Sequence, residues 1–159
     1  MAEDNEGLTF RVVLYQPEIP ANTGNIGRLC LGMDAQLHII KPMRFLINDK
    51  YLRRAGLDYW DQVNPVIHSD FESFLEKYSD QNIYFCSTKG SGIYSDRAFA
   101  LGDIFVFGPE TKGLPENILD RFQKQTLRIP MSDKIRSFNL ANSVSIILAE
   151  AWRQTGFKV

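Results

Sequence analysis

Short apolar runs and longer amphipathic stretches alternate along the chain. The run at residues 10–15 (FRVVLY) is rich in β-branched and aromatic residues, which is typical of a buried strand in a parallel sheet. Similar runs predict strands at residues 36–40 (QLHII), 83–86 (IYFC), 103–107 (DIFVF) and 126–129 (TLRI). A brief run within residues 64–68 predicts an edge strand, because Pro65 removes a backbone donor.

Between these runs, apolar residues recur at positions i, i+3, i+4 and i+7, which predicts helices with one buried face. The stripes are Ile26, Leu29, Cys30 and Met33; Phe71, Phe74, Leu75 and Tyr78; and Leu140, Val144, Ile147, Leu148 and Ala151. The first stripe follows a loop with two prolines, QPEIPANTG, and the second follows the capping-box pair Ser69 and Glu72. Shorter helices are expected at residues 51–57 and after Pro115.

Strands that alternate with helices predict an α/β fold, with a mostly parallel sheet flanked by helices. The length of 159 residues fits a single domain over residues 1–159, and the acidic, aperiodic residues 1–8 are expected to form a flexible tail. Because the net charge is only −1, a general nucleic-acid coat protein is excluded, and any contact with RNA must come from a local patch.

The two cysteines, Cys30 and Cys86, lie among apolar residues and indicate buried thiols in a reducing compartment. The sequence has no signal peptide and no apolar run of membrane-spanning length. We therefore expect a cytoplasmic protein without a membrane partner.

Candidate chemistry concentrates in four loops, each of which follows a predicted strand: PEIPANTGN, STKGSG, GPETKGLP and PMSDKIRSFN. In open α/β sheets such loops meet at the carboxyl edge of the strands, where ligands bind. No phosphate-binding motif and no Gly-x-Ser-x-Gly elbow is present. His38 and His68 stand alone in strand-like runs and the cysteines lack ligand spacing, so no metal site is expected and both histidines are interpreted as structural.

The last of these loops links the strand at residues 126–129 to the final helix and is polar and cationic. Lys134 and Arg136 lie in it, and Ser137 and Asn139 are suited both to capping the helix and to direct duty in a site. Together with Arg28, Glu110 and Lys112, these loops offer few ionisable groups. Such a set suits a reaction that needs alignment more than acid–base strength, as methyl transfer from an activated sulfonium donor does.

Three sequence motifs carry a resemblance to a known family. Residues 22–28 (NTGNIGR), 107–115 (FGPETKGLP), and 129–131 (IPM) with 136–143 (RSFNLANS) resemble, in order, the three motifs of the SPOUT superfamily of RNA methyltransferases. LYQPEIPANTGNIGRLC and YLRRAGLDYW are most similar to the small tRNA 2′-O-methyltransferases that act on the wobble nucleotide of the anticodon. The resemblance covers nearly the whole chain from Phe10 onward.

The resemblance implies that S-adenosylmethionine is the methyl donor and S-adenosylhomocysteine the product. The positions that match its cofactor site are Cys86, Gly108, Glu110, Ile129, Met131, Ser137 and Leu140. It also implies that Arg28 is catalytic, together with Ser137 and Asn139, and that Arg28, aided by a substrate phosphate, helps to deprotonate the ribose 2′-hydroxyl. Because a free arginine is too basic to remove a proton readily, the residues leave open whether Arg28 is a base or an electrostatic anchor.

The family further implies a deep trefoil knot in the C-terminal part and a homodimer whose sites are completed by the first and last helices. The side chains of Trp152 and Phe157 are compatible with such a dimer or with core packing. The candidate contacts to the tRNA substrate are Arg28, Arg53, Arg54, Lys112, Lys134 and Arg136. The function predicted is methylation of a wobble cytidine or modified uridine; the alternatives are another RNA 2′-O-methyltransferase of this fold, a non-catalytic RNA-binding module, and a nucleotide-binding α/β enzyme.

Overall fold

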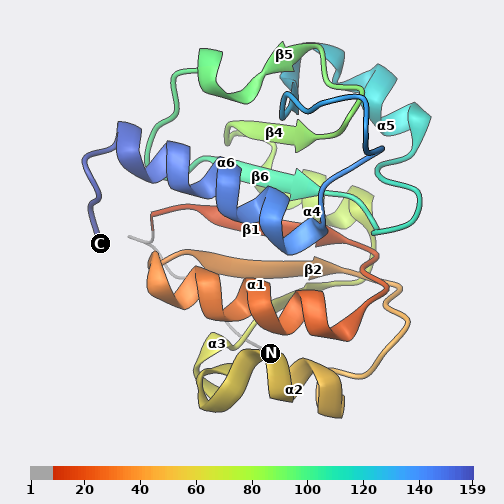
Figure 1. Cartoon of the computed structure of the whole chain (residues 1–159), viewed down its shortest axis with the longest axis vertical. Coiled ribbons are helices and arrows are strands. Elements are labelled where there is room, and N and C mark those ends of the chain that lie inside the picture. Colours follow the sequence, from red (N-terminus) through yellow and green to blue (C-terminus); the bar gives the residue numbers. More distant parts are fainter. Residues whose placement is uncertain (1–8) are drawn as a thin grey trace.

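The sheet of the protein is parallel and has the predicted α/β arrangement (Figure 1). A computed structural model describes residues 9–159, so the predicted tail at residues 1–8 lies outside the described residues. Within that range seven strands have the order β3-β2-β1-β6-β4-β7-β5. They are β1 (Arg11–Tyr15), β2 (Gln36–Ile40), β3 (Val66–His68), β4 (Ile83–Cys86), β5 (Gly92–Ile93), β6 (Ile104–Phe107) and β7 (Thr126–Arg128).

All the strand pairs of this sheet are parallel. β1 is central and lies between β2 and β6, while β3 forms one edge, as Pro65 predicts. β5 at the other edge was not predicted, because two residues after a glycine-containing loop carry no periodic signal. The carboxyl ends of the central strands therefore converge at one edge of the sheet, where the polar loops begin.

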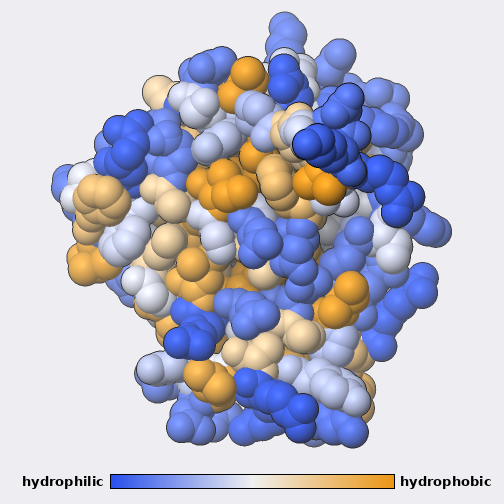
Figure 2. Space-filling view, viewed as in Figure 1, coloured by the Kyte–Doolittle hydropathy of each residue, from blue (hydrophilic) through white to orange (hydrophobic). Residues whose placement is uncertain are grey.

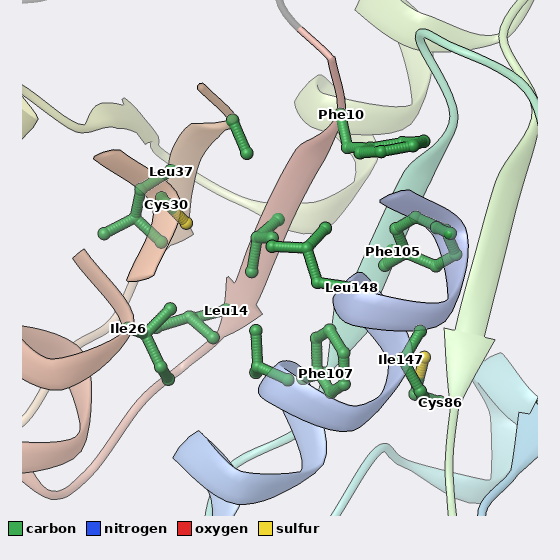
Figure 3. Close-up of a cluster of buried hydrophobic side chains, with 14 of the residues drawn as sticks. Phe10, Leu14, Ile26, Cys30, Leu37, Cys86, Phe105, Phe107, Ile147 and Leu148 are labelled. Atoms are coloured by element: carbon green, nitrogen blue, oxygen red, sulfur yellow. The ribbon is translucent and has the colours of Figure 1, made fainter. Parts of the chain in front are cut away.

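The helices cover both faces of the sheet. They are α1 (Pro20–Gly32), α2 (Lys50–Gly56), α3 (Trp60–Val63), α4 (Phe71–Tyr78), α5 (Glu116–Arg121) and α6 (Leu140–Gln154), with 3-10 turns at Leu57–Tyr59, Tyr94–Asp96 and Gln123–Gln125. Side chains of α1 and α6 share one buried cluster with β1, and side chains of α4 and α5 share another on the opposite face. Figure 3 shows the first cluster, in which Ile147 and Leu148 of α6 approach Phe105 and Phe107.

The first helix begins earlier than predicted. α1 starts at Pro20, inside the segment that we expected to be a loop, and it contains Gly24 and Gly27. A Cβ atom at Gly24 would lie 2.2 Å from the carbonyl oxygen of Leu52, and one at Gly27 would lie 2.7 Å from the Trp60 ring. These glycines, which in the sequence indicate a loop, are thus the positions at which α2 and α3 pack closely against α1.

Of two predicted helix caps, the structure corrects one and confirms the other. Asp70, not Ser69, caps α4, since its carboxylate accepts a hydrogen bond of 2.8 Å from the backbone N–H of Ser73. Asn139 caps α6 as predicted, with its side-chain oxygen 3.2 Å from the backbone nitrogen of Asn142. Ser137 lies before the cap and belongs to the exposed loop.

The two histidines do not stand alone. His38 on β2 and His68 on β3 are buried, their rings stack, and Nδ1 of His38 lies 2.9 Å from Nε2 of His68. Strand register brings them together: His68 pairs with Ile40, two residues after His38. They have a packing role beneath Tyr78 and Phe74.

At the C-terminus, Trp152 is half-buried and its indole N–H donates to the carbonyl of Lys158. Phe157 is exposed and meets the Trp152 ring edge-on. Trp152 is therefore engaged in part by its own chain, whereas Phe157 is exposed, and the dimer stays a prediction.

Candidate active site

A cavity of about 800 Å³ opens at the carboxyl edge of the sheet. Its walls come from the ends of β1, β4, β6 and β7, from the loops that follow them, and from the first two turns of α6. Phe107, Leu119, Leu127 and Ile147 supply apolar lining. Its volume lies in the range of roughly 300–1,000 Å³ that small-molecule and cofactor sites occupy.

The residues predicted to bind the cofactor all line this cavity: Cys86, Gly108, Glu110, Ile129, Met131, Ser137 and Leu140. They lie up to 54 residues apart in the sequence, in loops and at the ends of β4 and α6, and the parallel sheet brings these segments to one edge. Lys112 and Arg136 also line the cavity, so two of the predicted RNA contacts lie beside the predicted cofactor site. That these residues hold a cofactor stays a prediction.

Glu110 has a structural role that the sequence did not reveal. Its carboxylate accepts hydrogen bonds from the backbone N–H groups of Glu18 at 3.0 Å and Ile19 at 2.5 Å, directly before α1 begins. In return, the Glu18 carboxylate accepts hydrogen bonds from the backbone N–H and the hydroxyl of Thr111, at 3.1 and 2.7 Å. We call this reciprocal pair the Glu18–Glu110 clamp; it joins the loop after β6 to the start of α1.

The clamp continues into the loop before α6. The Asn22 side-chain amide lies 3.4 Å from the Glu110 carboxylate, and its oxygen accepts a hydrogen bond of 3.1 Å from the Asn139 side chain. Asn139 is therefore placed by α1 while it caps α6. Segments from all three sequence motifs are joined by this chain of polar contacts, in which Glu18 and Asn22 were not predicted. Glu18 lies in the proline-rich segment that we expected to be a loop, where no periodic pattern marks it.

Charges around the clamp favour the ionised form of Glu18. Hydrogen bonds from Thr111, and then the cations Arg44 and Lys112, hold the pKa of the Glu18 carboxyl below its ordinary value. Burial instead raises the pKa of the Cys86 thiol, which lines the cavity, well above its usual range. Cys86 is thus a neutral wall of the cavity and not a nucleophile.

Gly108 is required by its own loop. A Cβ atom there would lie 2.2 Å from the backbone nitrogen of Leu114 and 2.3 Å from the carbonyl carbon of Gly113, which has a φ of 66°. The loop after β6 therefore turns back on itself and presents its backbone to the cavity. This close return explains the glycine without any contact to a ligand.

The structure places Arg28 outside the cavity of its own chain. Arg28 is exposed on α1, and its guanidinium carbon lies 5.5 Å from the centre of the Tyr59 ring. Arg53 and Arg54, exposed on α2 as predicted, belong to the same side of the molecule, where α1 packs against α2. Lys134 is exposed in the loop before α6 and does not line the cavity. The predicted catalytic set of Arg28, Ser137 and Asn139 is therefore not assembled within one chain.

Within residues 9–159, no group of three or more histidine, cysteine, aspartate or glutamate side chains is arranged to hold a metal ion. In the same range, none of the helices is both long enough and apolar enough to cross a membrane.

The parallel sheet flanked by helices and the cavity at its carboxyl edge define the class of the protein, an α/β fold with a cavity large enough for a small molecule. The chain belongs to the SpoU rRNA methylase family, whose model matches residues 9–149. This match confirms the resemblance drawn from the three sequence motifs.

Among curated proteins, the chain is 49% identical to the tRNA (cytidine(34)-2′-O)-methyltransferase of Methylovorus glucosotrophus, over 93% of this chain and 97% of that protein. It is 50% identical to the protein of the same name from Escherichia coli K12, over 93% and 95% of the two chains. Both relatives have nearly the same length as this chain.

Solved structures share the fold. A structure concerned with 2′-OH methylation of C/U34 on tRNA superposes with a TM-score of 0.88 at 42% identity, over 92% of this chain and 96% of that chain. The SpoU methyltransferase AviRb from Streptomyces viridochromogenes, in complex with AdoMet, gives a TM-score of 0.82 at 23% identity, over 92% of this chain and 61% of that chain. The α/β fold is thereby confirmed, whereas the trefoil knot stays a prediction.

Proposed function

We propose that this protein transfers a methyl group from S-adenosylmethionine to the ribose 2′-hydroxyl of tRNA nucleotide 34, a cytidine or a modified uridine. The observation that carries the proposal is the cavity in which loops from the second and third motifs meet, tied to the first motif by the Glu18–Glu110 clamp. Relatives at about half identity over almost their whole length are named for this activity.

The lining of the cavity suits an adenosyl sulfonium compound. Leu127, Ile129 and Leu140 offer apolar contact to a neutral adenine, and the backbone of the turned loop after β6 offers hydrogen bonds without a phosphate cradle. The bound cofactor supplies a methyl group that its sulfonium charge has already activated, so the residues around it need mainly to align and to exclude water.

In the proposed mechanism, Arg28 acts on the substrate and not on the cofactor. Its guanidinium binds the phosphate beside nucleotide 34 and by its charge favours the alkoxide form of the 2′-hydroxyl, whose proton passes to water as the oxygen takes up the methyl group. The guanidinium is not the base, because a guanidinium group keeps its proton in proteins. Lys112 and Arg136 on the rim of the cavity bind neighbouring phosphates, with Lys134, Arg53 and Arg54 further out. Ser137 and Asn139 orient the nucleotide at the mouth of the cavity.

The proposal includes a homodimer in which Arg28 of one subunit serves the cavity of the other. It is supported by the position of Arg28, which lies outside the cavity of its own chain. The face that carries α1 and α6 mixes hydrophobic and hydrophilic side chains, as a subunit interface does (Figure 2). Because the relatives are bacterial enzymes named for tRNA, the proposal also includes a cytoplasmic location.

Methyl transfer to tRNA tests the activity. We expect the purified protein to transfer tritium from labelled S-adenosylmethionine to total tRNA, and nucleoside mass spectrometry to find the 2′-O-methyl group at position 34. Transfer to another nucleotide would replace the assigned substrate, and tRNA binding without transfer would indicate a non-catalytic RNA-binding module.

Subunit mixing tests the shared site. Arg28→Ala removes the arginine, and Ser137→Trp fills the mouth of the cavity from an exposed loop position. If the site is shared, mixed dimers regain activity, because the intact arginine of one chain then faces the intact cavity of the other. A mixture that stays inactive, although dimers of both chains form, would assign Arg28 to the cavity of its own chain.

A further inference from the structure

An exposed apolar ledge adjoins Arg28. It consists of the 3-10 turn Leu57–Tyr59 between α2 and α3, in which the side chains of Leu57 and Tyr59 are 50% and 46% exposed. From inside, Trp60 holds this ledge: its ring packs on Gly27 of α1, and its indole N–H donates to the carbonyl of Ile47 at 3.1 Å. The ledge is therefore fixed to α1 while its own side chains face outward.

The backbone of the ledge is strained. Leu57 has a φ of 55° and a ψ of −152°, a region that only glycine occupies without cost. Strain of this kind persists only where the surrounding structure fixes the backbone, and it is concentrated at active sites and ligand-binding sites. Here the strained residue is Leu57, and both Leu57 and Tyr59 are about half exposed, so burial of their side chains does not offset the strain in the free protein.

The charges beside the ledge are cationic. The Arg28 guanidinium lies over the Tyr59 ring, and the Asp61 carboxylate is already paired with Arg53 at 3.0 Å. Arg28 and Arg54 have no ion-pair partner within residues 9–159. Asp58 is the one acidic residue of the ledge itself. An exposed aromatic ring beside an arginine without an ion-pair partner is the combination that binds unstacked RNA bases.

We propose that the ledge is a nucleobase-stacking site, on which an unstacked base of the anticodon loop lies against the exposed part of the Tyr59 ring while Arg28 binds the adjoining phosphate. This inference rests on the proposed function and names the part of the substrate that the ledge receives. A base held on Tyr59 fixes the ribose–phosphate backbone next to Arg28, so the same ring positions the arginine and the nucleotide on which the arginine acts.

Binding of an anticodon stem-loop RNA to the full-length protein at several salt concentrations tests the stacking site. We expect Tyr59→Ala to weaken binding about tenfold, with an unchanged salt dependence, because stacking releases no counterions. Tyr59→Phe, which keeps the ring, is expected to bind within twofold of the wild type. Arg54→Ala should instead make the salt dependence shallower, by about one unit of logarithmic slope.

Tyr51→Ala is the matched control. Tyr51 is 51% exposed and lies beside a cation, Lys50, but it does not contact Arg28. We expect its removal to change the affinity less than twofold, and an equal loss in both alanine variants would overturn the assignment to Tyr59. The assignment would also be overturned if Tyr59→Ala bound the RNA as tightly as the wild type, or if the substitution changed only the slope of the affinity against salt concentration.

Calorimetry and light scattering test whether Tyr59→Ala keeps the fold and the oligomeric state of the wild type. Calorimetry with S-adenosylhomocysteine is expected to give the same affinity for both proteins, which establishes that the variant is folded. Light scattering is expected to give the same mass; a shift to a smaller species would mean that a second copy covers the ledge, which overturns the inference. The RNA-binding comparison is independent of methyl transfer, so an inactive wild-type protein would contradict the proposed function without deciding the role of Tyr59.

Discussion

Two regions of this molecule are built on different principles. The cavity at the carboxyl edge is made of loops that are far apart in the sequence, turn back on themselves and present backbone and apolar groups. The block of α1, α2 and α3 is made of helices packed closely through Gly24 and Gly27, and it presents arginines and tyrosines. Under the proposed function, the cofactor and the RNA would be bound by these separate regions of one chain, which the Glu18–Glu110 clamp joins.

The largest effect is expected from Arg28→Ala. Removing one charged group that stabilises a developing oxyanion costs about 10²–10³-fold in turnover. We expect this loss in methyl transfer under single-turnover conditions, with the calorimetric affinity for S-adenosylhomocysteine unchanged. Ser137→Trp should instead lose affinity for S-adenosylhomocysteine, because the indole fills the mouth of the cavity. If Arg28→Ala also lost that affinity, the two regions would not be separate.

The second effect tests the helical block. In Gly24→Ala, the added methyl group meets the Leu52 carbonyl at 2.2 Å, so α2 must move away from α1. We expect the free energy of unfolding to fall by about 3 kcal/mol, as measured by urea denaturation. Gly32→Ala on the same helix is the control, since a Cβ atom there has no neighbour within 4 Å; it should stabilise the protein by about 0.5–1 kcal/mol. Equal results for both variants would contradict the close packing.

A third and smaller effect concerns the clamp. Glu110→Gln keeps the size of the side chain but replaces one accepting oxygen by a donor, which weakens the hydrogen bonds to Glu18 and Ile19. We expect a loss of about 1–2 kcal/mol in stability. Faster hydrogen exchange at the first turn of α1 should accompany it, while exchange in α4 stays unchanged. Uniformly faster exchange would mean that the clamp supports the whole fold and not the contact between the two regions.

The smallest effect is the pH dependence of the clamp. Because the pKa of Glu18 is lowered in the folded protein, its ionised form stabilises the fold fully above its ordinary value of 4.5, and this contribution is lost as the pH falls through the lower folded value. The stability difference between the wild type and Glu18→Gln should therefore shrink as the pH is lowered from 4.5. A difference that grew on acidification would contradict the assigned hydrogen bonds from Thr111.

Helices and strands with a clear hydrophobic period could be predicted from the sequence, whereas helix boundaries that depend on tertiary packing could not. The strand at residues 10–15 and the final helix are visible in their patterns because each buries one continuous apolar set. The start of α1 was misplaced because Gly24 and Gly27 act through Leu52 and Trp60, which lie on later helices of the chain. The cap of α4 was misplaced by one residue for a related reason: Ser69 and Asp70 are equally good caps, and only the backbone geometry selects between them.

All the predicted cavity residues except Cys86 were found because they lie in the second and third motifs, and their convergence follows from the parallel sheet. Glu18 was missed since a carboxylate in a proline-rich loop has no periodic signal, and its partner Thr111 comes 93 positions later. The ledge was missed because the exposure of Leu57 and Tyr59 depends on which side of the turn Trp60 occupies.

The close packing of α1 at Gly24 and Gly27 has a mechanical consequence. Because α1 and α2 pack closely at Gly24, with no side chain between them, we expect the two helices to behave as one rigid unit. This unit carries Arg28 on α1 and Arg53 and Arg54 on α2. A second subunit that bound α1 would therefore fix the positions of all three arginines together.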